Sequence, residues 1–116
     1  MLFIEYPKCT TCIKAKKFLM NEGIEFNDRN IKEDNPNKEE LIKWHKLSNL
    51  PLKKLFNTSG LLYKELNLKD KLDTMSDTEK YELLASNGML VKRPILVLDN
   101  VVLFGFKEEE YKKVIK

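Results

Sequence analysis

The feature that most constrains this chain is a short segment near its start that combines a strand, a sharp turn and a helix. Residues 2–6 form a brief, mostly apolar run, as a buried parallel strand requires, and Pro7 ends it. From Thr10 onward the apolar residues recur with a helical period. The only two cysteines, Cys9 and Cys12, lie at the start of that helix. The segment predicts an α/β fold with both thiols beside a helix N-terminus.

A cysteine in this position has altered acidity. We expect Cys9 at or just before the first residue of the helix, where free N–H groups and the helix dipole favour negative charge. Thiols at such sites commonly have a pKa of roughly 3.5–7.5, and the neighbouring Lys8 would lower the pKa of Cys9 further. Cys12 follows one helical turn later, close enough to attack a mixed disulfide on Cys9. The spacing therefore predicts a nucleophile, Cys9, and a resolving thiol, Cys12.

Paired cysteines also occur in zinc sites and as inert thiols in an apolar core. A structural zinc site needs about four ligands and usually a second paired motif, whereas this chain has a single histidine, His45, and no third cysteine. We therefore predict no metal and no cofactor. Inert thiols remain an alternative, although a CxxC between a strand and a helix is a fairly specific redox signature.

Length and composition restrict the class of protein. A chain of 116 residues suits one domain with a single core. Its apolar runs are far shorter than the ~18 residues of a membrane span, and it shows no charged leader with a cleavage site. We therefore expect a cytoplasmic protein without a membrane partner. In a reducing compartment, paired cysteines are more often catalytic or sensing than a permanent cross-link.

The charge pattern gives little support for nucleic-acid binding. The net charge of +3 is mild and is spread along the chain. Among the 21 basic residues only Arg29 and Arg93 are arginines, so few planar groups are present for bidentate contacts to oxyanions. Because no basic stripe interleaved with aromatic residues is visible, we predict no direct nucleic-acid partner.

The first half of the chain predicts a βαβ unit followed by helices. Gly23 should end the first helix, and residues 24–31 should form a second strand parallel to the first. A helical insertion then covers about residues 36–90. Its first helix is capped either by Asn35 or by Asn37.

The end of the insertion and the last third of the chain predict further elements. Residues 76–79 form a capping box that begins another helix. Within residues 91–98 we expect a strand that Pro94 opens. A two-residue turn at 99–100 and an antiparallel strand over 101–104 follow, and a helix begins at Glu108. The expected order is βαβ, helical insertion, ββα, with a four-stranded mixed sheet in a single domain over residues 1–116.

Four sequence runs carry a resemblance to a known family: YPKCTTC at 6–12, FNTSG at 56–60, GMLVKRPI at 88–95 and VLFGF at 102–106. Together they resemble the arsenate reductase/Spx branch of the thioredoxin superfamily, in particular its Spx/MgsR-like members. The resemblance covers nearly the whole chain. It implies a thioredoxin-like fold.

The resemblance also implies roles for individual residues. Cys9 matches the nucleophilic cysteine of the family, Arg93 matches an arginine that holds an oxyanion in arsenate reductases, and Pro94 matches the cis proline beside the active cysteine. We expect Cys9, Cys12 and Arg93 to be the catalytic residues. The expected substrate-binding residues are Lys8, Thr10, Thr11 and Pro94.

Two departures from the arsenate reductase pattern matter. Those reductases use three arginines around the thiolate, whereas two of these positions hold Asn57 and Gly105 here, which carry no charge. One arginine, Lys8 and a helix terminus stabilise a dianion less well, which argues against genuine arsenate reduction. The second departure is Cys12, since those reductases tend to have a residue other than cysteine at this position and rely on an outside thiol. Cys12 instead matches the CxxC of the Spx regulators.

Three functions follow as hypotheses. The first, which we favour, is a thiol–disulfide oxidoreductase that acts on an oxidised thiol and is reset by an external thiol reductant. The second is a redox-sensing regulator that acts through RNA polymerase, as the resemblance to Spx implies. The third is an adaptor module whose thiols have no chemical role.

Overall fold

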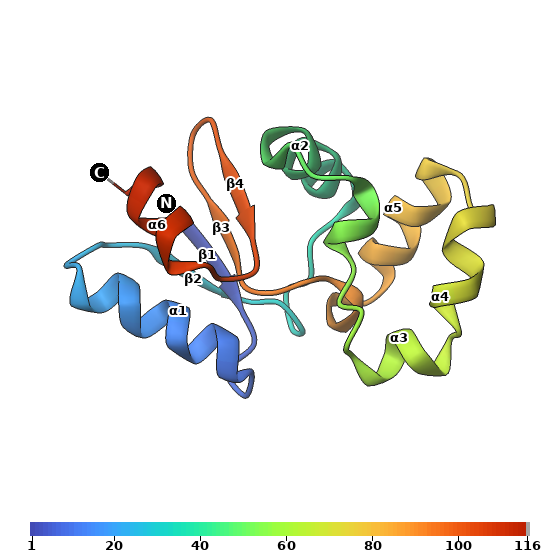
Figure 1. Cartoon of the computed structure of the whole chain (residues 1–116), viewed down its shortest axis with the longest axis horizontal. Coiled ribbons are helices and arrows are strands. Elements are labelled where there is room, and N and C mark those ends of the chain that lie inside the picture. Colours follow the sequence, from blue (N-terminus) through green and yellow to red (C-terminus); the bar gives the residue numbers. More distant parts are fainter. Residues whose placement is uncertain (116) are drawn as a thin grey trace.

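The computed structural model describes residues 1–115; Lys116, the last residue of the predicted domain, lies outside them. The molecule is elongated, 43 × 28 × 24 Å, with the strands towards one end and most of the helices towards the other (Figure 1). The sheet half consists of β1 (Leu2–Glu5), α1 (Thr10–Asn21), β2 (Asn27–Asn30), β3 (Ile95–Val97), β4 (Val102–Phe104) and α6 (Glu108–Val114). The helical insertion consists of α2 (Lys38–Ser48), α3 (Leu61–Glu65), α4 (Leu68–Lys71), α5 (Asp77–Ser86) and the short 3₁₀ helices η1 (Leu52–Leu55), η2 (Leu72–Thr74) and η3 (Gly88–Leu90).

The four strands form one mixed sheet in the order β2-β1-β3-β4. β1 pairs with β2 in parallel, and β1–β3 and β3–β4 are antiparallel. The predicted order of βαβ, helical insertion and ββα is therefore confirmed, and the fold is thioredoxin-like. The parallel pair requires a crossover connection, and α1 supplies it.

Strand residues alternate between two hydrophobic clusters, one on each face of the sheet. Phe3 of β1 and Leu96 of β3 join the cluster that α1 and α6 cover, where Ala15 and Tyr111 are also fully buried. The neighbouring residue Ile4 faces the other way, into the cluster that α2 and the rest of the insertion complete. Both faces are thus covered, which explains the nearly continuous apolar runs in β1 and β3.

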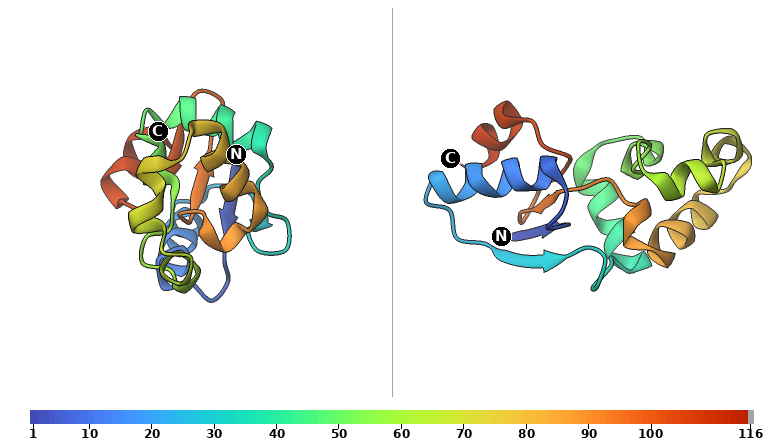
Figure 2. Two further views of the ribbon diagram at one scale, coloured as in Figure 1. Left: turned by 90° about the vertical axis from the view of Figure 1, so that its right-hand side faces the viewer. Right: turned by 90° about the horizontal axis from the view of Figure 1, so that it is seen from below.

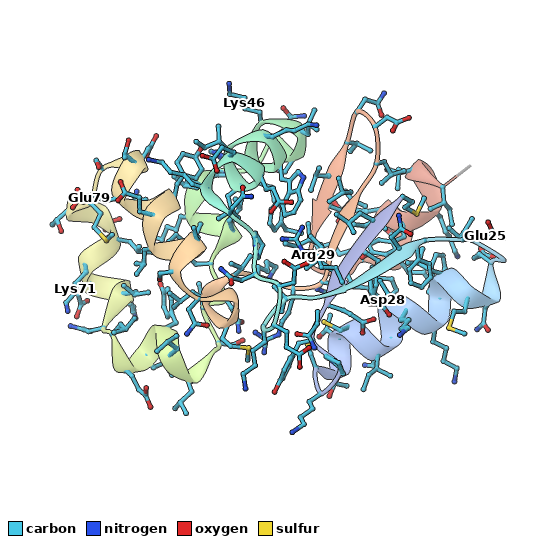
Figure 3. The ribbon with its side chains drawn as sticks, turned by 180° about the vertical axis from the view of Figure 1, so that it is seen from behind. Glu25, Asp28, Arg29, Lys46, Lys71 and Glu79 are labelled. Carbon is cyan, nitrogen blue, oxygen red and sulfur yellow. The ribbon has the colours of Figure 1, made fainter. Side chains whose placement is uncertain are left out.

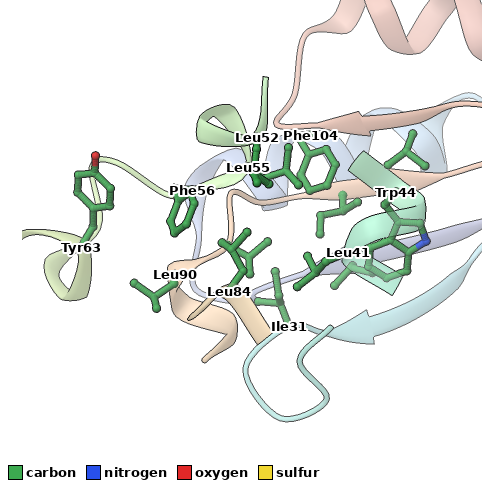
Figure 4. Packing of buried hydrophobic residues seen from close by; sticks show 14 of the residues in the cluster. Ile31, Leu41, Trp44, Leu52, Leu55, Phe56, Tyr63, Leu84, Leu90 and Phe104 are labelled. Atoms are coloured by element: carbon green, nitrogen blue, oxygen red, sulfur yellow. The ribbon is translucent and has the colours of Figure 1, made fainter. Parts of the chain in front are cut away.

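The cluster between the sheet and the insertion is the larger of the two. Leu41 and Trp44 of α2 pack in it beside Leu84 of α5 (Figure 4). Phe56 and Leu90 extend the cluster towards the site described below. Seen from below the view of Figure 1, the insertion lies beyond the end of the sheet rather than over α1 (Figure 2).

β2 connects the two halves through side chains that point in opposite directions. Asp28 binds Lys16 of α1, with 2.6 Å between Oδ2 and Nζ. The next residue, Arg29, lies at the junction of the two halves (Figure 3) and donates to both carboxylate oxygens of Glu40 on α2, at 2.7 and 2.9 Å. The polar character of this strand therefore has a structural reason, since its side chains make the ionic contacts to both halves.

The second strand is shorter than predicted. Strand pairing begins at Asn27 rather than at residue 24, because the N–H of Ile24 still bonds the carbonyl of Leu19 at the end of α1. Phe26 precedes the strand and packs against β1, with its ring centroid 5.4 Å from that of Phe3.

The strand predicted to open at Pro94 begins one residue later, since β3 covers Ile95–Val97. Val91, earlier in the same run, pairs with Phe56 of the insertion in an isolated bridge. The preceding segment is thereby held against the insertion, between the two halves of the molecule.

Most of the predicted helix ends are confirmed. Gly23 follows α1 with φ +70°, and Ser76 and Glu79 form a complete capping box on α5. Of the two candidate caps for α2, Asn37 is the one used, with its side chain accepting the N–H of Glu40.

The lone histidine has a structural role. His45 contacts the Tyr81 hydroxyl through Nδ1 and the Leu50 carbonyl through Nε2 at 2.7 Å. It thus links α2 to α5, away from the cysteines.

Candidate active site

The turn between β1 and α1 places Cys9 at the N-cap of the helix. Its backbone is extended, with φ −85° and ψ 122°, and its carbonyl accepts the N–H of Ile13 at 3.0 Å to begin the helical ladder. On the other side, the N–H of Cys9 donates to the carbonyl of Tyr6 at 2.9 Å and closes the turn. The predicted helix start is therefore confirmed to the residue. The Cys9 side chain is half-buried and so retains access to solvent.

The surroundings of Cys9 favour its thiolate. Burial alone would raise the pKa of the thiol, but three groups together outweigh it: the backbone N–H of Cys12, the thiol of Cys12 and the guanidinium of Arg93. The net effect lowers the pKa of Cys9 below its ordinary value. The direction is that expected for a thiol at a helix N-terminus next to an arginine.

Cys12 has the opposite character. It is 0% exposed, and burial raises the pKa of its thiol to about 12, with a further contribution from the neighbouring Cys9. The N–H of Tyr6 points at its sulfur across 3.5 Å and lowers the pKa only in part. The two thiols thus differ: Cys9 is partly accessible and has a lowered pKa, whereas Cys12 is buried and has a raised pKa.

Arg93 reaches the sulfur from the segment that leads into β3. Its guanidinium carbon lies 5.3 Å from the centroid of the Tyr6 ring, and the group is shielded there. Nε and Nη1 are buried and find no hydrogen-bond partner within residues 1–115. A cation with so little solvation interacts more strongly with a nearby sulfur anion.

Arg93 is followed directly by a cis peptide bond. The bond between Arg93 and Pro94 is cis, as the resemblance implied, and the Pro94 carbonyl accepts the N–H of Gly105 at 2.8 Å. This contact draws the end of β4 onto the segment that carries Arg93. Three stretches far apart in sequence therefore meet at Cys9.

These stretches, together with the turn before α3, enclose a cavity of about 330 Å³. It lies between the start of α1, the turn before α3 and the connection from β4 to α6. The lining residues are Cys9, Thr11, Asn57, Ser59, Gly60, Lys92, Arg93, Phe104, Gly105, Phe106 and Lys107. A volume near the lower end of the range for ligand sites, roughly 300–1,000 Å³, suits a small substrate or one residue of a larger one.

The structure brings most of the predicted site residues together. Cys9, Thr11 and Arg93 line the cavity. Cys12 and Pro94 are buried and do not line it. Lys8 and Thr10 are exposed in the turn and do not line the cavity either.

Two lysines that the sequence analysis did not single out also line the cavity. Lys92 and Lys107 were not among the predicted site residues. Nothing distinguishes these two lysines from the many others in the chain, apart from the position of Lys92 beside Arg93. Their place in the cavity depends on how the connection from β4 to α6 packs against the start of α1 and the insertion, and the sequence analysis did not predict that packing.

No metal-binding cluster accompanies the two thiols in the part of the chain that the structure describes, since no three His, Cys, Asp or Glu side chains are grouped there as a metal site would require. No helix in residues 1–115 combines the length and apolar character needed to cross a membrane.

Comparison with known proteins agrees with this geometry. The model of the ArsC family matches residues 4–114. The uncharacterised protein YusI of Bacillus subtilis is 52% identical over 113 residues, which cover 97% of this chain and 96% of YusI. The regulatory protein MgsR of the same organism is 34% identical over 116 residues, covering 100% of this chain and 90% of MgsR.

A solved structure shows the same architecture. The crystal structure of an ArsC-family-related protein from Bacteroides fragilis superposes with a TM-score of 0.95 at 56% identity, covering 97% of this chain and 94% of that one. The family match spans both halves of the molecule and all three stretches that meet at Cys9. This chain therefore belongs to the ArsC family.

Proposed function

We propose that this chain is a thiol–disulfide oxidoreductase in which Cys9 attacks an oxidised sulfur and Cys12 resolves the adduct. The observation that supports this most directly is the opposite acidity of the two thiols at one helix start. A nucleophile must be an anion when the substrate arrives, and a resolving thiol must not compete with it.

The reaction balances without a cofactor. The Cys9 thiolate attacks one sulfur of a disulfide, a new sulfur–sulfur bond forms, and the second substrate sulfur leaves with the electron pair. Cys12 then gives its proton to the departing thiolate or to water and attacks the Cys9 sulfur, which releases the rest of the substrate as a thiol. The chain has lost two electrons and holds a Cys9–Cys12 disulfide, which an external thiol reductant returns to the dithiol.

A disulfide suits the cavity better than arsenate does. Arg93 provides the single guanidinium among the described lining residues, whereas Lys92 and Lys107 are point charges that cannot make the bidentate contacts of an arginine to an oxyanion. A disulfide is uncharged at sulfur and needs only that the thiolate and the leaving group be stabilised, for which one arginine and the helix start are sufficient.

Two cysteine variants test the proposal against a disulfide substrate such as 2-hydroxyethyl disulfide with an added thiol reductant. Cys9→Ser should lower turnover by at least about 10³-fold, because the nucleophile is lost. Cys12→Ser should still take up one substrate thiol per chain, seen as an added mass on Cys9, while turnover slows because the internal resolving step is lost. Unchanged turnover in Cys9→Ser would remove this cysteine from the mechanism and overturn the proposal.

A second candidate function is a redox-sensing regulator. The relative that supports it is MgsR, named a regulatory protein, which matches this chain over its whole length. Oxidation of Cys9 and Cys12 would then alter a binding surface, and RNA polymerase is the partner that the resemblance to Spx implies. Affinity capture tests whether the chain is such a regulator. The baits are the reduced chain, the oxidised chain and the Cys9→Ser/Cys12→Ser double variant. Redox-dependent recovery of polymerase subunits supports the regulator, whereas their absence from all three samples contradicts it.

A further inference from the structure

We infer that Lys92 and Lys107 form an anion subsite beside Cys9, and that the preferred substrate is a disulfide with a carboxylate a few bonds from the attacked sulfur. This inference rests on the proposed function and specifies its substrate class. Its support comes from the charge of the cavity, the way in which one lysine is held, and the size of the space.

The cavity carries an excess of positive charge. Lys92, Arg93 and Lys107 line it, and no Asp or Glu is among its described lining residues. A concave surface lined by one sign of charge attracts ligands of the opposite sign and raises their rate of association. An anionic substrate is therefore favoured in this cavity over a neutral or cationic one of the same size.

Both lysines are also available to bind an anion. Within residues 1–115, the lysines that form ion pairs with carboxylates are Lys16, Lys38, Lys53 and Lys112. Lys92 and Lys107 are exposed and are not in this set. Among the glutamates that follow Lys107, Glu108 pairs with Lys112, and Glu110 lines an adjoining cavity rather than this one.

Gly105 provides the space for the Lys92 side chain. The glycine has φ +85°, and a Cβ built on it would lie 2.9 Å from Cε and 3.8 Å from Nζ of Lys92. The lysine stem therefore crosses the backbone where any other residue would place its side chain. The Lys92 backbone is fixed as well, because its N–H donates to the Leu55 carbonyl at 2.7 Å. The end of the Lys92 side chain therefore lies beside the connection from β4 to α6.

The size of the cavity limits how far the anion can lie from the reacting sulfur. Cys9 and both lysines line the same space of about 330 Å³, so a small substrate can reach the lysines and the Cys9 sulfur at the same time. The two lysines also line an adjoining cavity of about 240 Å³ together with Lys54. Glu110 also lines this adjoining cavity, so the excess of positive charge is greatest on the side that faces Cys9.

Two kinds of substrate carry a carboxylate close to a disulfide: the disulfide of a small thiol acid, and a polypeptide with an acidic residue beside its cysteine. Both place a carboxylate within a few bonds of a disulfide sulfur. Lysine suits a carboxylate that approaches in more than one orientation, because its ammonium acts as a point charge on a flexible stem.

The experiment compares three small disulfides that differ mainly in charge: 3,3′-dithiodipropionate (anionic), 2-hydroxyethyl disulfide (neutral) and cystamine (cationic). The rate of adduct formation on Cys9 is measured for the intact chain at low salt. We expect the anionic disulfide to react about tenfold faster than the neutral one, and cystamine to react most slowly. Lys92→Gln/Lys107→Gln should reduce the anionic preference to about twofold and leave the neutral rate within about twofold of the original.

A matched control removes the same charge elsewhere. Lys43→Gln/Lys46→Gln lies on α2, and neither residue lines this cavity. This variant should retain the preference. Equal rates for the three disulfides in the unmodified chain, or an equal loss of preference in both double variants, would overturn the subsite.

Alkylation makes the subsite testable apart from disulfide exchange. Iodoacetate and iodoacetamide differ by one negative charge, and the mass added at Cys9 gives the rate for each. The Lys92/Lys107 variant should lower the ratio of the two rates even if no disulfide reacts, whereas failure of the neutral disulfide to react would count against the proposed function alone. An unchanged ratio would contradict the subsite.

A last pair of substrates separates the two sources. Mixed disulfides of a short peptide with Glu or Gln beside its cysteine are compared with the small disulfides. A larger charge preference among the peptides than among the small molecules assigns the subsite to polypeptide substrates, and a smaller one assigns it to thiol acids.

Discussion

The sheet half and the helical insertion contribute unequally to the site. The sheet half supplies every reactive group: both thiols at the start of α1, and Arg93 just before β3. The insertion supplies Asn57, Ser59 and Gly60, which form one wall of the cavity and carry neither charge nor a strong nucleophile. The difference indicates that reactivity depends on local backbone geometry in one half, while the shape of the cavity depends on how the other half is attached.

The attachment itself rests on a few close contacts. The start of η3 passes the end of β2 so closely that a Cβ on Gly88 would lie 1.8 Å from the carbonyl oxygen of Ile31. Arg29 and Glu40 add a bidentate ion pair at the same junction. Changes that act on the junction should therefore alter stability, and changes at Cys9 should alter chemistry.

The largest expected effect comes from Gly88→Ala. The added methyl group would collide with backbone, which cannot move aside as a side chain can, so we expect a loss of about 3 kcal/mol in the free energy of unfolding. Urea unfolding followed by circular dichroism measures it. Gly23→Ala is the matched control, since Gly23 has φ +70° but nothing within 4 Å of an added Cβ. Its cost should be about 1 kcal/mol. Equal costs for the two variants would show that the halves are not in close contact there.

A second prediction concerns the sheet half alone. Burial raises the pKa of Glu5 to about 7, and Asp28 adds to the shift while Lys16 opposes it. Above pH 4.5 the unfolded chain therefore releases this proton more readily than the folded chain does, and stability falls as the pH rises to about 7. Glu5→Gln stays neutral and should be more stable than the unmodified chain at pH 8, by on the order of 2 kcal/mol.

Thermal unfolding between pH 4.5 and pH 8 checks this prediction. The two proteins should converge near pH 4.5. Glu25→Gln, at an exposed position before β2, removes the same charge and serves as the control, which should not gain comparable stability at pH 8. Parallel curves for Glu5→Gln and the unmodified chain would contradict the prediction.

The third prediction separates the charge of Arg93 from its packing. Arg93→Met keeps an unbranched side chain over Tyr6 and removes the charge that lowers the pKa of Cys9. The pKa of Cys9 should rise, and the rate of alkylation by iodoacetamide at pH 6 should fall about tenfold. Arg93→Lys should lie between the two, because it keeps the charge without the planar group. An identical pH–rate profile for Arg93→Met would exclude a role for this charge.

The smallest effect is expected within the insertion. Ser76→Ala removes the side chain that accepts the Glu79 N–H at 3.1 Å, and should lower the free energy of unfolding by about 1 kcal/mol. Cys9 should react with iodoacetamide at an unchanged rate. Thr78→Ala, inside the same helix, is the control and should cost less. A change in Cys9 reactivity in Ser76→Ala would contradict the separation of the two halves.

The parts of the molecule that could be predicted from sequence are those fixed by neighbouring residues. The start of α1 at Thr10, the end of the helix at Gly23 and the capping box at Ser76 depend on residues within a few positions of one another, and all three were predicted. The cis bond before Pro94 was expected only through the family resemblance. The strand limits were less accurate, because β2 and β3 end where they meet groups from distant parts of the chain.

The unpredicted residues of the site depend on distant contacts in the same way. Lys92 enters the cavity because Gly105 makes space for it, and the two are brought together by the pairing of β3 with β4. Lys8, adjacent to Cys9 in sequence, was predicted to act on the thiol but lies in the exposed turn. Proximity along the chain was therefore a poor guide to proximity at the sulfur.

The complete burial of Cys12 has a consequence that can be counted. A reagent arriving from solution meets the Cys9 sulfur first, since the other sulfur has no exposed surface. Titration of native chains with a bulky maleimide should therefore consume one equivalent, and a second equivalent should be consumed only after denaturant is added.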